Sequence, residues 1–406
     1  MTRSYLIAGL LVLTAPVDFT APLAAQKPAP KTSVTGTINK PAARPPSPEV
    51  VERLTVPDGF AVSVFAENVG RPRMMAVSAD GTVYVTRWET NDVIALRAGE
   101  GGRAGGPRVV AADLKQVHGI VLHDQQVFLA SPTTVWSATI AADGGFSAPR
   151  EIVQNLPDGG QHRGRTIAIG PDGMLYISVG SSCNDCAEAN KEHATMLRTS
   201  LGGGERTTFA RGLRDTIGFG WHPETKALWG MDNGADWKGD RVPPEELNEI
   251  TEGADYGWPL CYGRRVADHA TVAEPKDLGK ENQSKEQYCA ETQPAVLEYA
   301  AHSAPIGMTF YTGTQFPAQY RGDAFVVFRG SWNRAEPSGY KVARVRFEKG
   351  VPTRFEDFLA GFLSADGAAH FGRLAGIAVA HDGSLLVSDD TNGVIYRVAH
   401  GTGAPR

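Results

Sequence analysis

The chain has 406 residues, of which 42% are hydrophobic and 21% charged, so it is long enough to bury a sizeable core. Its formal net charge of -5 gives no electrostatic reason to expect binding to nucleic acid or to an anionic membrane surface. The 46 glycines and 26 prolines, together with the scarcity of long helical patterns, favour a fold of strands and turns. We therefore expect the binding partner to be a small molecule.

The N-terminus has the layout of a secretory signal peptide over residues 1–25. Arg3 is followed by an apolar run at 5–15 and by small residues around 23–25. That run is shorter than the roughly 20 apolar residues of a membrane-spanning helix, although a retained anchor is the alternative. We expect a periplasmic or secreted protein with no membrane span after cleavage.

The next segment, residues 26–48, is rich in proline, alanine and lysine. Such a composition cannot bury a core, so we expect a flexible, extended linker. The folded domain is then expected to cover residues 49–400.

Four cysteines, an even number in a chain with an export signal, predict disulfides. They allow three pairings, and we favour the pairing of sequence neighbours, Cys183–Cys186 and Cys261–Cys289. Covalent c-type haem needs C-x-x-C-H, and Ala187 stands where the histidine would be. Zinc is the alternative at the first pair, but the sequence offers neither a second C-x-x-C nor a close histidine pair.

A repeated unit organises most of the chain: a turn with Asp-Gly or a substitute, an alternating strand, a break and a second strand. Asp-Gly before an alternating run is a strong hairpin signal, because both residues accept the positive φ of tight turns. The spacing of about 45–60 residues is that of a four-stranded propeller blade. We predict an all-β fold, a six-bladed β-propeller with four-stranded antiparallel blades, and loop insertions between 234 and 320; a pair of β-sandwiches is the rival. The six units lie at residues 78–96, 122–139, 170–180, 222–234, 320–330 and 380–398.

Longer motifs follow one another in a fixed order. They are QHRGRTIAIGPDGMLYISVG, FARGLRDTIGFGWHPETKALWGMDNGADWKGD, EELNEITEGADYGWP, HSAPIGMTFY, GDAFVVFRGSWNR and GRLAGIAVAHDGSLLVSDDTNGVIYRV. Together they resemble the soluble glucose/sorbosone (aldose sugar) dehydrogenases that depend on pyrroloquinoline quinone (PQQ), over residues 50–398. The SSCNDC and RGSWNR segments are most similar to the L-sorbosone/pyranose dehydrogenase branch. The resemblance implies a propeller that binds PQQ and calcium.

The resemblance implies that His162 and Arg214 are catalytic. His162, in QHRGR, matches the family's general base, and an imidazole with a pKa near 6.5 is suited to accepting a substrate hydroxyl proton. Its alternative role is to cap a loop. Arg163 and Arg165 flank this histidine and are candidates for orienting it or the substrate. Arg214, in GLRD, matches an arginine that lies against the quinone oxygens, where a fixed cation stabilises negative charge.

Three more positions match cofactor contacts of the family. Arg329 and Arg373 match basic residues at the carboxylates of PQQ, which arginine recognises bidentately. Asp215 stands where the family usually has asparagine. A carboxylate there opposes an anionic cofactor unless it faces calcium or pairs with Arg214.

The resemblance places calcium at the MDNGADWKGD loop. The consecutive backbone carbonyls of Gly234 and Ala235 match family ligands of the calcium that accompanies PQQ. Calcium prefers many oxygen ligands, so three carboxylates of this loop are further candidates for the same ion or a second one. These are Asp232, Asp236 and Asp240. The alternative is an acidic, solvated turn, and the spacing is not that of an EF-hand.

Other residues match loops around the family's cofactor pocket. Tyr299 and His302 lie in EYAAHSAP, where His302 is either a polar contact of the cofactor or a structural residue. Trp332 is expected to form a wall of the pocket, and Lys341 to meet a cofactor carboxylate. Both alternatively pack or remain solvated.

These expectations combine into an oxidoreductase that acts on CH–OH or hydrated aldehyde groups of a sugar or aldehyde. His162 takes the hydroxyl proton while hydride passes to PQQ, and calcium and Arg214 stabilise the developing charge. Because the sequence has no haem-attachment motif, the electrons are expected to pass to an external cytochrome or quinone. A calcium-dependent lactonase-like hydrolase, which would not need the three arginines, and a non-catalytic envelope propeller that binds carbohydrate are the alternatives.

Overall fold

The repeated turns of the sequence each join the first two strands of one antiparallel sheet. In the turns at Asp80, Asp172 and Asp382 the aspartate accepts a hydrogen bond from the backbone N–H two residues on, and the next glycine takes a positive φ. Asp80 accepts from Thr82 at 3.1 Å, with Gly81 at φ 83°. This local pattern fixes the register of the hairpins.

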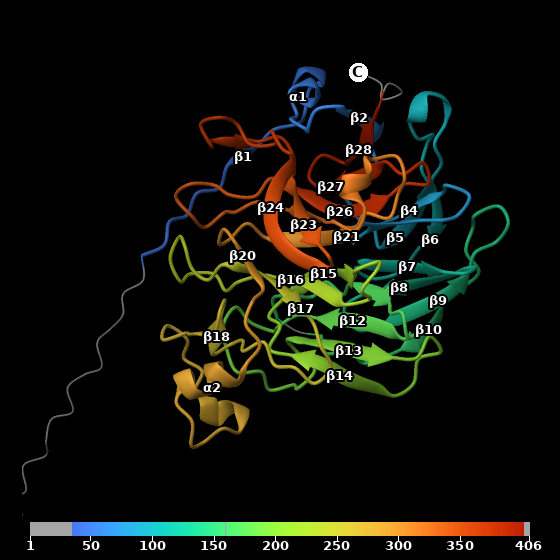
Figure 1. Ribbon diagram of the computed structural model, residues 1–406. Coiled ribbons are helices and arrows are strands. Elements are labelled where there is room, and N and C mark those ends of the chain that lie inside the picture. The colour runs from blue at the N-terminus through green and yellow to red at the C-terminus, as the bar shows by residue number, and fades with distance from the viewer. Residues whose placement is uncertain (1–34, 159, 402–406) are drawn as a thin grey trace, which may run out of the picture. The chain divides into compact units, whose positions relative to one another are not determined.

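The structure, a computed structural model, describes residues 35–401 except 159. In this region the sequence forms six four-stranded antiparallel sheets, the blades of a β-propeller (Figure 1). The predicted fold is confirmed. None of the helices in this region has the length and hydrophobicity that a bilayer crossing needs.

In each blade the first-named strand lies nearest the axis, where it contacts the innermost strands of the neighbouring blades. Blade 1 contains β3 (Pro72–Val77), β4 (Val83–Arg87), β5 (Asp92–Leu96) and β6 (Arg108–Ala111). Blade 2 contains β7 (Gly119–His123), β8 (Gln126–Ala130), β9 (Val135–Thr139) and β10 (Arg150–Val153). Blade 3 contains β11 (Ile167–Ile169), β12 (Leu175–Val179), β13 (Thr195–Thr199) and β14 (Arg206–Arg211).

Blades 4 to 6 follow the same order, except that the outermost strand of blade 6 is β2, which precedes blade 1 in the sequence. Blade 4 contains β15 (Thr216–Trp221), β16 (Leu228–Asp232), β17 (Glu245–Glu249) and β20 (Leu297–Tyr299). Blade 5 contains β21 (Pro305–Phe310), β22 (Ala324–Phe328), β23 (Lys341–Glu348) and β24 (Val351–Leu359). Blade 6 contains β26 (Leu374–Val379), β27 (Leu385–Asp389), β28 (Val394–His400) and β2 (Phe60–Ala66).

The ring is closed by pairing the two ends of the folded chain. Strand β2 runs antiparallel to β28, with Phe60 opposite His400 and Val62 opposite Val398. In Figure 1 the blue β2 lies beside the red β28. Blade 6 therefore exists only when both ends of the chain are in place.

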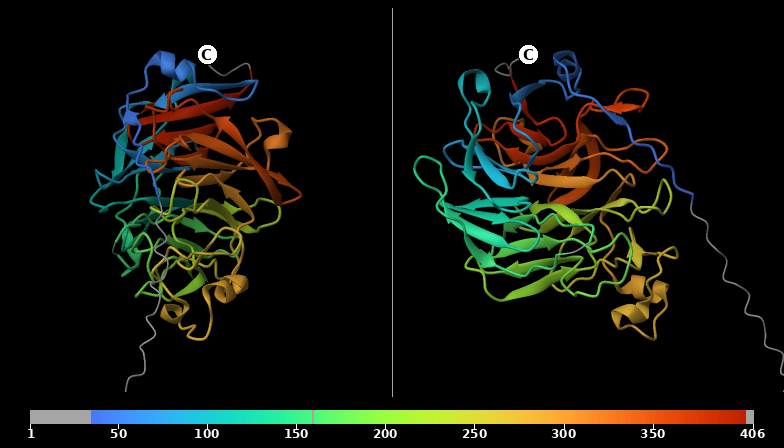
Figure 2. Two further views of the ribbon diagram at one scale, coloured as in Figure 1. Left: turned by 90° about the vertical axis from the view of Figure 1, so that its left-hand side faces the viewer. Right: turned by 180° about the vertical axis from the view of Figure 1, so that it is seen from behind.

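The predicted insertion between 234 and 320 lies in blade 4, between its third and fourth strands. It contains β18 (Cys261–Tyr262), β19 (Val266–Ala267), a 3-10 turn (Pro275–Leu278) and α2 (Lys285–Glu291). It projects from the edge of the blade in both views of Figure 2. The disulfide Cys261–Cys289 ties its two ends together, and Cys183–Cys186 also forms, so the favoured pairing is confirmed.

The N-terminal segment differs from the expected flexible linker where the structure describes it. The predicted signal peptide, 1–25, and the first part of the predicted linker lie outside the described residues. From residue 35 onward the chain lies along the propeller, and β1 (Ala42–Ala43) pairs in parallel with β25 (Ala369–His370). A proline-rich segment buries little, but its backbone N–H groups still find acceptors on a folded neighbour. We call residues 37–44 the strap.

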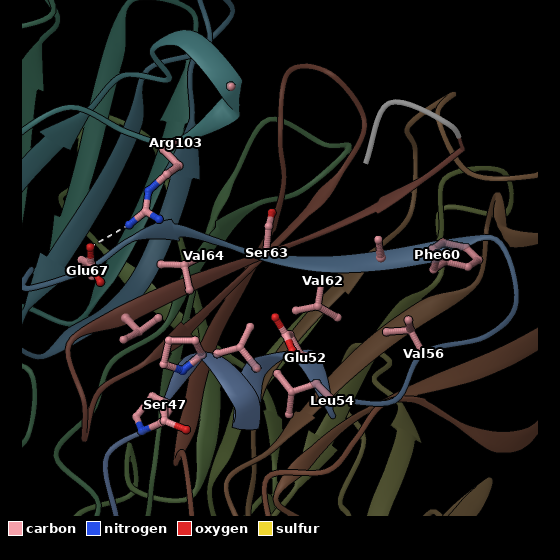
Figure 3. A pocket seen from close by; sticks show the side chains of 16 residues that line it. Ser47, Glu52, Leu54, Val56, Phe60, Val62, Ser63, Val64, Glu67 and Arg103 are labelled. Atoms are coloured by element: carbon pink, nitrogen blue, oxygen red, sulfur yellow. Dashed lines mark hydrogen bonds and ion pairs between the residues drawn. The ribbon is translucent and has the colours of Figure 1, made fainter. Parts of the chain in front are cut away.

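After the strap, α1 (Pro48–Glu52) packs across the outer strand of blade 6. The Ser47 hydroxyl caps this helix by accepting from the Val50 N–H at 3.4 Å. A groove of about 730 Å³ between α1 and β2 is lined mainly by apolar side chains such as Leu54 and Val62 (Figure 3). The remaining short elements are 3-10 turns at Glu100–Gly102 and Ala318–Tyr320.

Large aromatic side chains fill the space between blades 5 and 6. Tyr311 stacks on Phe316 with ring centroids 4.3 Å apart, and Phe325 meets Phe358 edge-on at 4.6 Å. All four are buried. Side chains of 150–250 Å² that leave water in this way supply much of the stability of such a sheet interface.

Near the axis the inner strands approach one another at glycines. A Cβ on Gly307 would lie 2.5 Å from the carbonyl oxygen of Ala375 in the next blade. A Cβ on Gly119 would overlap the carbonyl oxygen of Arg165, and one on Gly376 would overlap that of Arg73. The absence of a side chain at these positions lets the six inner strands close into a narrow ring.

Gly119→Ala is expected to lower the free energy of unfolding by about 1–3 kcal/mol, because the new methyl must displace backbone. Urea denaturation measures this change as a lower midpoint with an unchanged slope. Gly105→Ala is the matched control, since a Cβ there meets nothing within 4 Å, and we expect a change within about 0.5 kcal/mol. Equal stabilities of the two variants would contradict the close approach.

Candidate active site

The six blades present corresponding loops at one end of the propeller. Since adjacent strands run antiparallel, the start of the first strand, the end of the second and the start of the third lie at the same end of a blade. We call this end the mouth. At or just before the start of each inner strand stands an arginine or a histidine, and we call these six residues the basic ring. They are Arg73, His118, Arg165, Arg214, His302 and Arg373.

One side of the basic ring is held together by shared hydrogen bonds between blades 6, 1, 2 and 3. Arg73 and Arg329 both donate to the Asp390 carboxylate, at 2.6 and 2.7 Å. Arg73 also lies 3.2 Å from Nε2 of His118, whose Nδ1 is 3.2 Å from the carbonyl oxygen of Arg165. Burial and then the charge of Arg73 lower the pKa of His118 to about 3. His118 is thus neutral, with Nδ1–H donating and Nε2 accepting.

The other side of the basic ring is linked through backbone groups. The Ser181 N–H donates to the Arg214 carbonyl at 2.7 Å, between blades 3 and 4. His302 Nε2 lies 2.7 Å from the Gly239 carbonyl, between blades 5 and 4. Arg373 donates to the Gly330 carbonyl at 3.1 Å, between blades 6 and 5. The hydrogen bonds therefore run through all six blades.

His162 lies at this mouth with one ring nitrogen committed and one free. Its Nδ1 is 3.0 Å from the Ser181 carbonyl and 2.8 Å from the Ser181 hydroxyl, which itself donates to the Cys183 carbonyl at 2.7 Å. A carbonyl only accepts, so Nδ1 carries the proton and Nε2 carries the lone pair. Nε2 makes no hydrogen bond within the described part of the chain. Burial and then the charge of Arg214 lower the pKa of His162 to about 3, so the ring is neutral.

The two arginines that flank His162 have different surroundings. Arg165 is fully buried and donates to the His162 carbonyl at 2.8 Å and to the Pro157 carbonyl at 2.6 Å. Burial lowers its pKa to about 10, which leaves it cationic at neutral pH. Arg163 forms an ion pair with Asp158 at 3.0 Å nearer the solvent. Arg165 therefore orients the backbone of His162, whereas Arg163 does not contact it.

Arg214 is buried and held by amide groups rather than by a carboxylate. Nε and Nη2 donate to the backbone and side-chain oxygens of Asn184, both at 2.9 Å, and Nη1 donates to the Asn233 carbonyl at 3.1 Å. No ion pair of Arg214 occurs among residues 35–401 that the structure describes. The orientation of the Arg214 side chain is thus fixed, while its positive charge is not neutralised by a carboxylate of the described residues.

Asp215 and Asp232 have different roles beside Arg214. Asp232 accepts from the N–H groups of Arg214 and Asp215, at 2.9 and 2.8 Å, and from the Thr216 hydroxyl at 2.6 Å. Both carboxylate oxygens of Asp232 thus accept hydrogen bonds from residues at or just before the start of β15. The Asp215 carboxylate has no hydrogen-bond donor in the described region. Burial raises the pKa of each to about 6, although Arg214 opposes the shift.

The three candidate calcium carboxylates do not gather around one point. Asp232 is used as just described, and Asp240 accepts from the N–H groups of Thr37 and Ala335 at 2.8 and 2.9 Å. Asp236 accepts from Asn333 at 2.7 Å. Within the described residues, the one group of three or more acidic, histidine or cysteine side chains close enough to share a metal ion is Cys183, Cys186 and Glu188, and both cysteines are in a disulfide.

The backbone of the same loop is better suited to a cation. The carbonyl oxygens of Gly234 and Ala235 accept no hydrogen bond from the described residues. Glu245, which the sequence did not single out, holds this loop by accepting from the N–H groups of Gly234 and Ala304, both at 2.9 Å. Burial raises the pKa of Glu245 to about 7. Two uncommitted carbonyls on a fixed loop fit part of a calcium shell.

The remaining predicted residues are spread over different positions. Tyr299 lies on the outermost strand of blade 4 and stacks on Phe328 at 4.1 Å, and Lys341 pairs with Asp357 at 2.7 Å. Neither makes a hydrogen bond or an ion pair to the basic ring. Trp332 lies at the rim of the mouth, where its ring meets Trp237 at 5.0 Å. We therefore retain Trp332 as a candidate and leave out Tyr299 and Lys341.

Comparison with known proteins assigns the chain to a family. The TrAA12-like family model matches residues 54–401, so this protein belongs to the TrAA12-like family. An uncharacterised protein of Borreliella burgdorferi is 29% identical over 366 residues, which cover 86% of this chain and 92% of that protein.

Solved structures share the fold at low sequence identity. An iodide structure of the Trichoderma reesei carbohydrate-active enzyme of family AA12 has a TM-score of 0.75 and 20% identity, covering 86% of this chain and 98% of that one. The holo form of the pyranose dehydrogenase PQQ domain from Coprinopsis cinerea has a TM-score of 0.71 and 21% identity, and the match covers 89% of this chain and 100% of that domain. The propeller is thus common to all three.

The low pKa of His162 makes stability depend on pH. The unfolded chain binds a proton at this residue below a pH of about 6.5, whereas the folded chain does not until about 3, so stability falls as the pH falls through this window. His162→Gln is expected to remove up to about 1.4 kcal/mol per pH unit of that loss. Buried Asp215 and Glu245 have raised pKa values and act in the opposite direction, so the informative quantity is the difference between wild type and variant in urea denaturation from pH 7 to 5. Parallel curves would contradict a neutral His162.

Proposed function

We propose that this protein is a PQQ- and calcium-dependent oxidoreductase that oxidises a sugar or a related aldehyde in the periplasm or outside the cell. The observation that carries the proposal is the pairing of a neutral His162, with Nε2 free, and a fixed Arg214 at one mouth. Membership of the TrAA12-like family and the shared fold with a pyranose dehydrogenase PQQ domain support it.

The charges of the mouth fit a cofactor with three carboxylates. Arg73 and Arg329 share the single carboxylate of Asp390, and Arg373 has no ion pair in the described region. The Nε atoms of Arg73, Arg165 and Arg373 are buried without a hydrogen-bond partner. Buried donors of this kind normally have an acceptor, and arginine pairs bidentately with carboxylates. Arg329 and Arg373 would hold the carboxylates, and Arg214 the quinone oxygens.

Calcium would be held by the carbonyl oxygens of Gly234 and Ala235. Calcium takes six to eight oxygens, so these two supply part of the shell and leave the rest to cofactor oxygens and water. The same argument disfavours the lactonase alternative. A hydrolytic calcium site built from side chains needs converging carboxylates, and those of Asp232 and Asp240 are already used by backbone donors.

When bound, PQQ would supply the two-electron acceptor that side chains lack. His162 would accept the substrate hydroxyl proton at Nε2. Its Nδ1 would keep its own proton, which is hydrogen-bonded to Ser181. Arg214, already oriented by Asn184, stabilises negative charge without further rearrangement. Negative charge held at Arg214 would offset the charge that, after burial, lowers the pKa of His162, and a higher pKa makes His162 a better base. The electrons would pass to an external cytochrome or quinone.

The first experiment is reconstitution of the purified protein with PQQ and calcium, followed by dye reduction with a panel of aldoses and aldehydes. Activity is expected to require both additives. His162→Ala is expected to lower kcat by about 10²–10⁴-fold with PQQ still bound, because proton transfer is lost while the arginines remain. His123→Ala, an exposed histidine of β7, is the control. Absence of PQQ binding, or full activity in His162→Ala, would contradict the proposal.

Asp215 gives a second prediction, on the affinity for PQQ. Its carboxylate is ionised above a pH of about 6 and repels an anionic cofactor, although Arg214, Arg165 and Arg73 offset part of its charge. The Kd of PQQ for the wild type is expected to decrease by about fivefold as the pH falls from 7.5 to 5.5. Asp215→Asn is expected to bind PQQ more tightly at pH 7.5 and to lose most of this dependence, as fluorescence titration measures. A similar pH dependence of the Kd for PQQ in the wild type and in Asp215→Asn would contradict this role of Asp215 and would assign the dependence to Asp232 or Glu245.

A further inference from the structure

The strap crosses the rim of the mouth and is anchored on loops of blades 4 and 5 and on the segment that leads into blade 6. The Thr37 N–H donates to Asp240 at 2.8 Å, and the Asn39 N–H donates to the Trp332 carbonyl at 3.1 Å, both in loops of blades 4 and 5. The Arg44 N–H donates to the His370 carbonyl at 2.9 Å, just before blade 6. Lys40 lies between these anchors.

Between the strap and the propeller lies a cavity of about 300 Å³, which we call the strap pocket. Its lining combines cationic and aromatic side chains: Lys40, Pro41, Trp332, Tyr340, His370 and Arg373. Arg373 belongs to the basic ring, so the strap pocket adjoins the candidate active site. A sugar has a size that such a volume holds.

The strap pocket carries positive charge without a compensating carboxylate. Lys40 and Arg373 form no ion pair with the described residues. Nε of Arg373 and Nδ1 of His370 are buried without a hydrogen-bond partner. Burial and then the charge of Arg373 lower the pKa of His370 to about 4, so it is a neutral polar group at neutral pH. Such surroundings favour an anionic ligand with further polar groups.

Aromatic faces complete the strap pocket. The Lys40 ammonium lies 5.3 Å from the centroid of the Trp332 ring, and Trp237 meets Trp332 edge-on at 5.0 Å. Trp237 remains 54% exposed and has φ 68°, a left-handed conformation that is costly for a large residue. An exposed tryptophan held in a strained conformation indicates a function outside the core. Flat aromatic faces beside a cation suit a ring-shaped ligand that carries an acid group.

We propose that the strap pocket binds the carboxylate of an acidic sugar, so that uronic acids are preferred to neutral aldoses. The preference in turnover rests on the proposed dehydrogenase function, whereas binding does not. Lys40 holds the carboxylate, and Trp332 packs against the sugar ring. Lys40 is exposed and belongs to the strap, outside the loops of the basic ring, so its charge is open to a ligand that enters from solvent.

The test uses Lys40→Met, which removes the charge but keeps an unbranched side chain against Trp332. Binding of D-glucuronate and D-glucose is measured by calorimetry, and kcat/KM for both by dye reduction with PQQ and calcium. The wild type is expected to bind glucuronate about tenfold more tightly than glucose. In Lys40→Met the ratio of kcat/KM for glucuronate to that for glucose is expected to fall about tenfold. Lys276→Met, an exposed lysine outside the strap pocket, is the matched control and leaves the ratio unchanged.

Two results of the binding measurements would overturn the proposal. One is equal affinity of the wild type for glucuronate and glucose. The other is a loss of PQQ affinity in Lys40→Met without a change in the sugar ratio, which would assign the strap pocket to a cofactor carboxylate. Dye reduction by neutral sugars alone would reject this inference and leave the dehydrogenase function intact. Failure of every sugar to reduce the dye would reject that function, while calorimetry would still test the strap pocket.

Discussion

The close approach of the six inner strands at glycines determines the geometry of the mouth. Gly307 can lie against the next inner strand only because it has no Cβ, and Gly119 and Gly376 do the same elsewhere. A narrow ring brings loop residues of neighbouring blades within hydrogen-bond reach of one another. The contact between Arg73 and Asp390, separated by 317 positions in sequence, is a direct result. Wider spacing would leave these charges in solvent, where they attract little.

The fold was predictable because its signal is local. Turns such as that at Asp80 and Gly81 depend on neighbouring residues, so six similar turns reveal six blades without knowledge of distant contacts. Only part of the candidate site could be predicted, because much of it depends on contacts between segments that are far apart in the sequence. His162 and Arg214 lie in recognisable motifs, but the surroundings of Arg73 and His118 arise only when blades 6, 1, 2 and 3 meet. An arginine or a histidine stands at or just before the start of every inner strand, and this recurrence is present in the sequence.

The loop predicted to bind calcium shows why residue type alone is not enough to assign ligands. Its aspartates have the chemistry of calcium ligands, yet Asp240 accepts a hydrogen bond from Thr37, 203 positions away, and Asp232 orders the start of β15. Residue type alone does not reveal which lone pairs are already used. The uncommitted oxygens belong to the backbone at Gly234 and Ala235, whose availability depends on conformation rather than on side-chain identity.

The closure of blade 6 has a consequence for the order in which the protein is completed. Strand β2 precedes the other blade strands in the sequence, whereas its partner β28, which ends at His400, follows all of them. Five blades are able to form while synthesis continues, whereas the sixth is completed only when β28 has been made. Arg373 and Asp390 lie in that blade, so the mouth is assembled last. A chain that ends before β28 therefore lacks both the closed ring and the complete mouth.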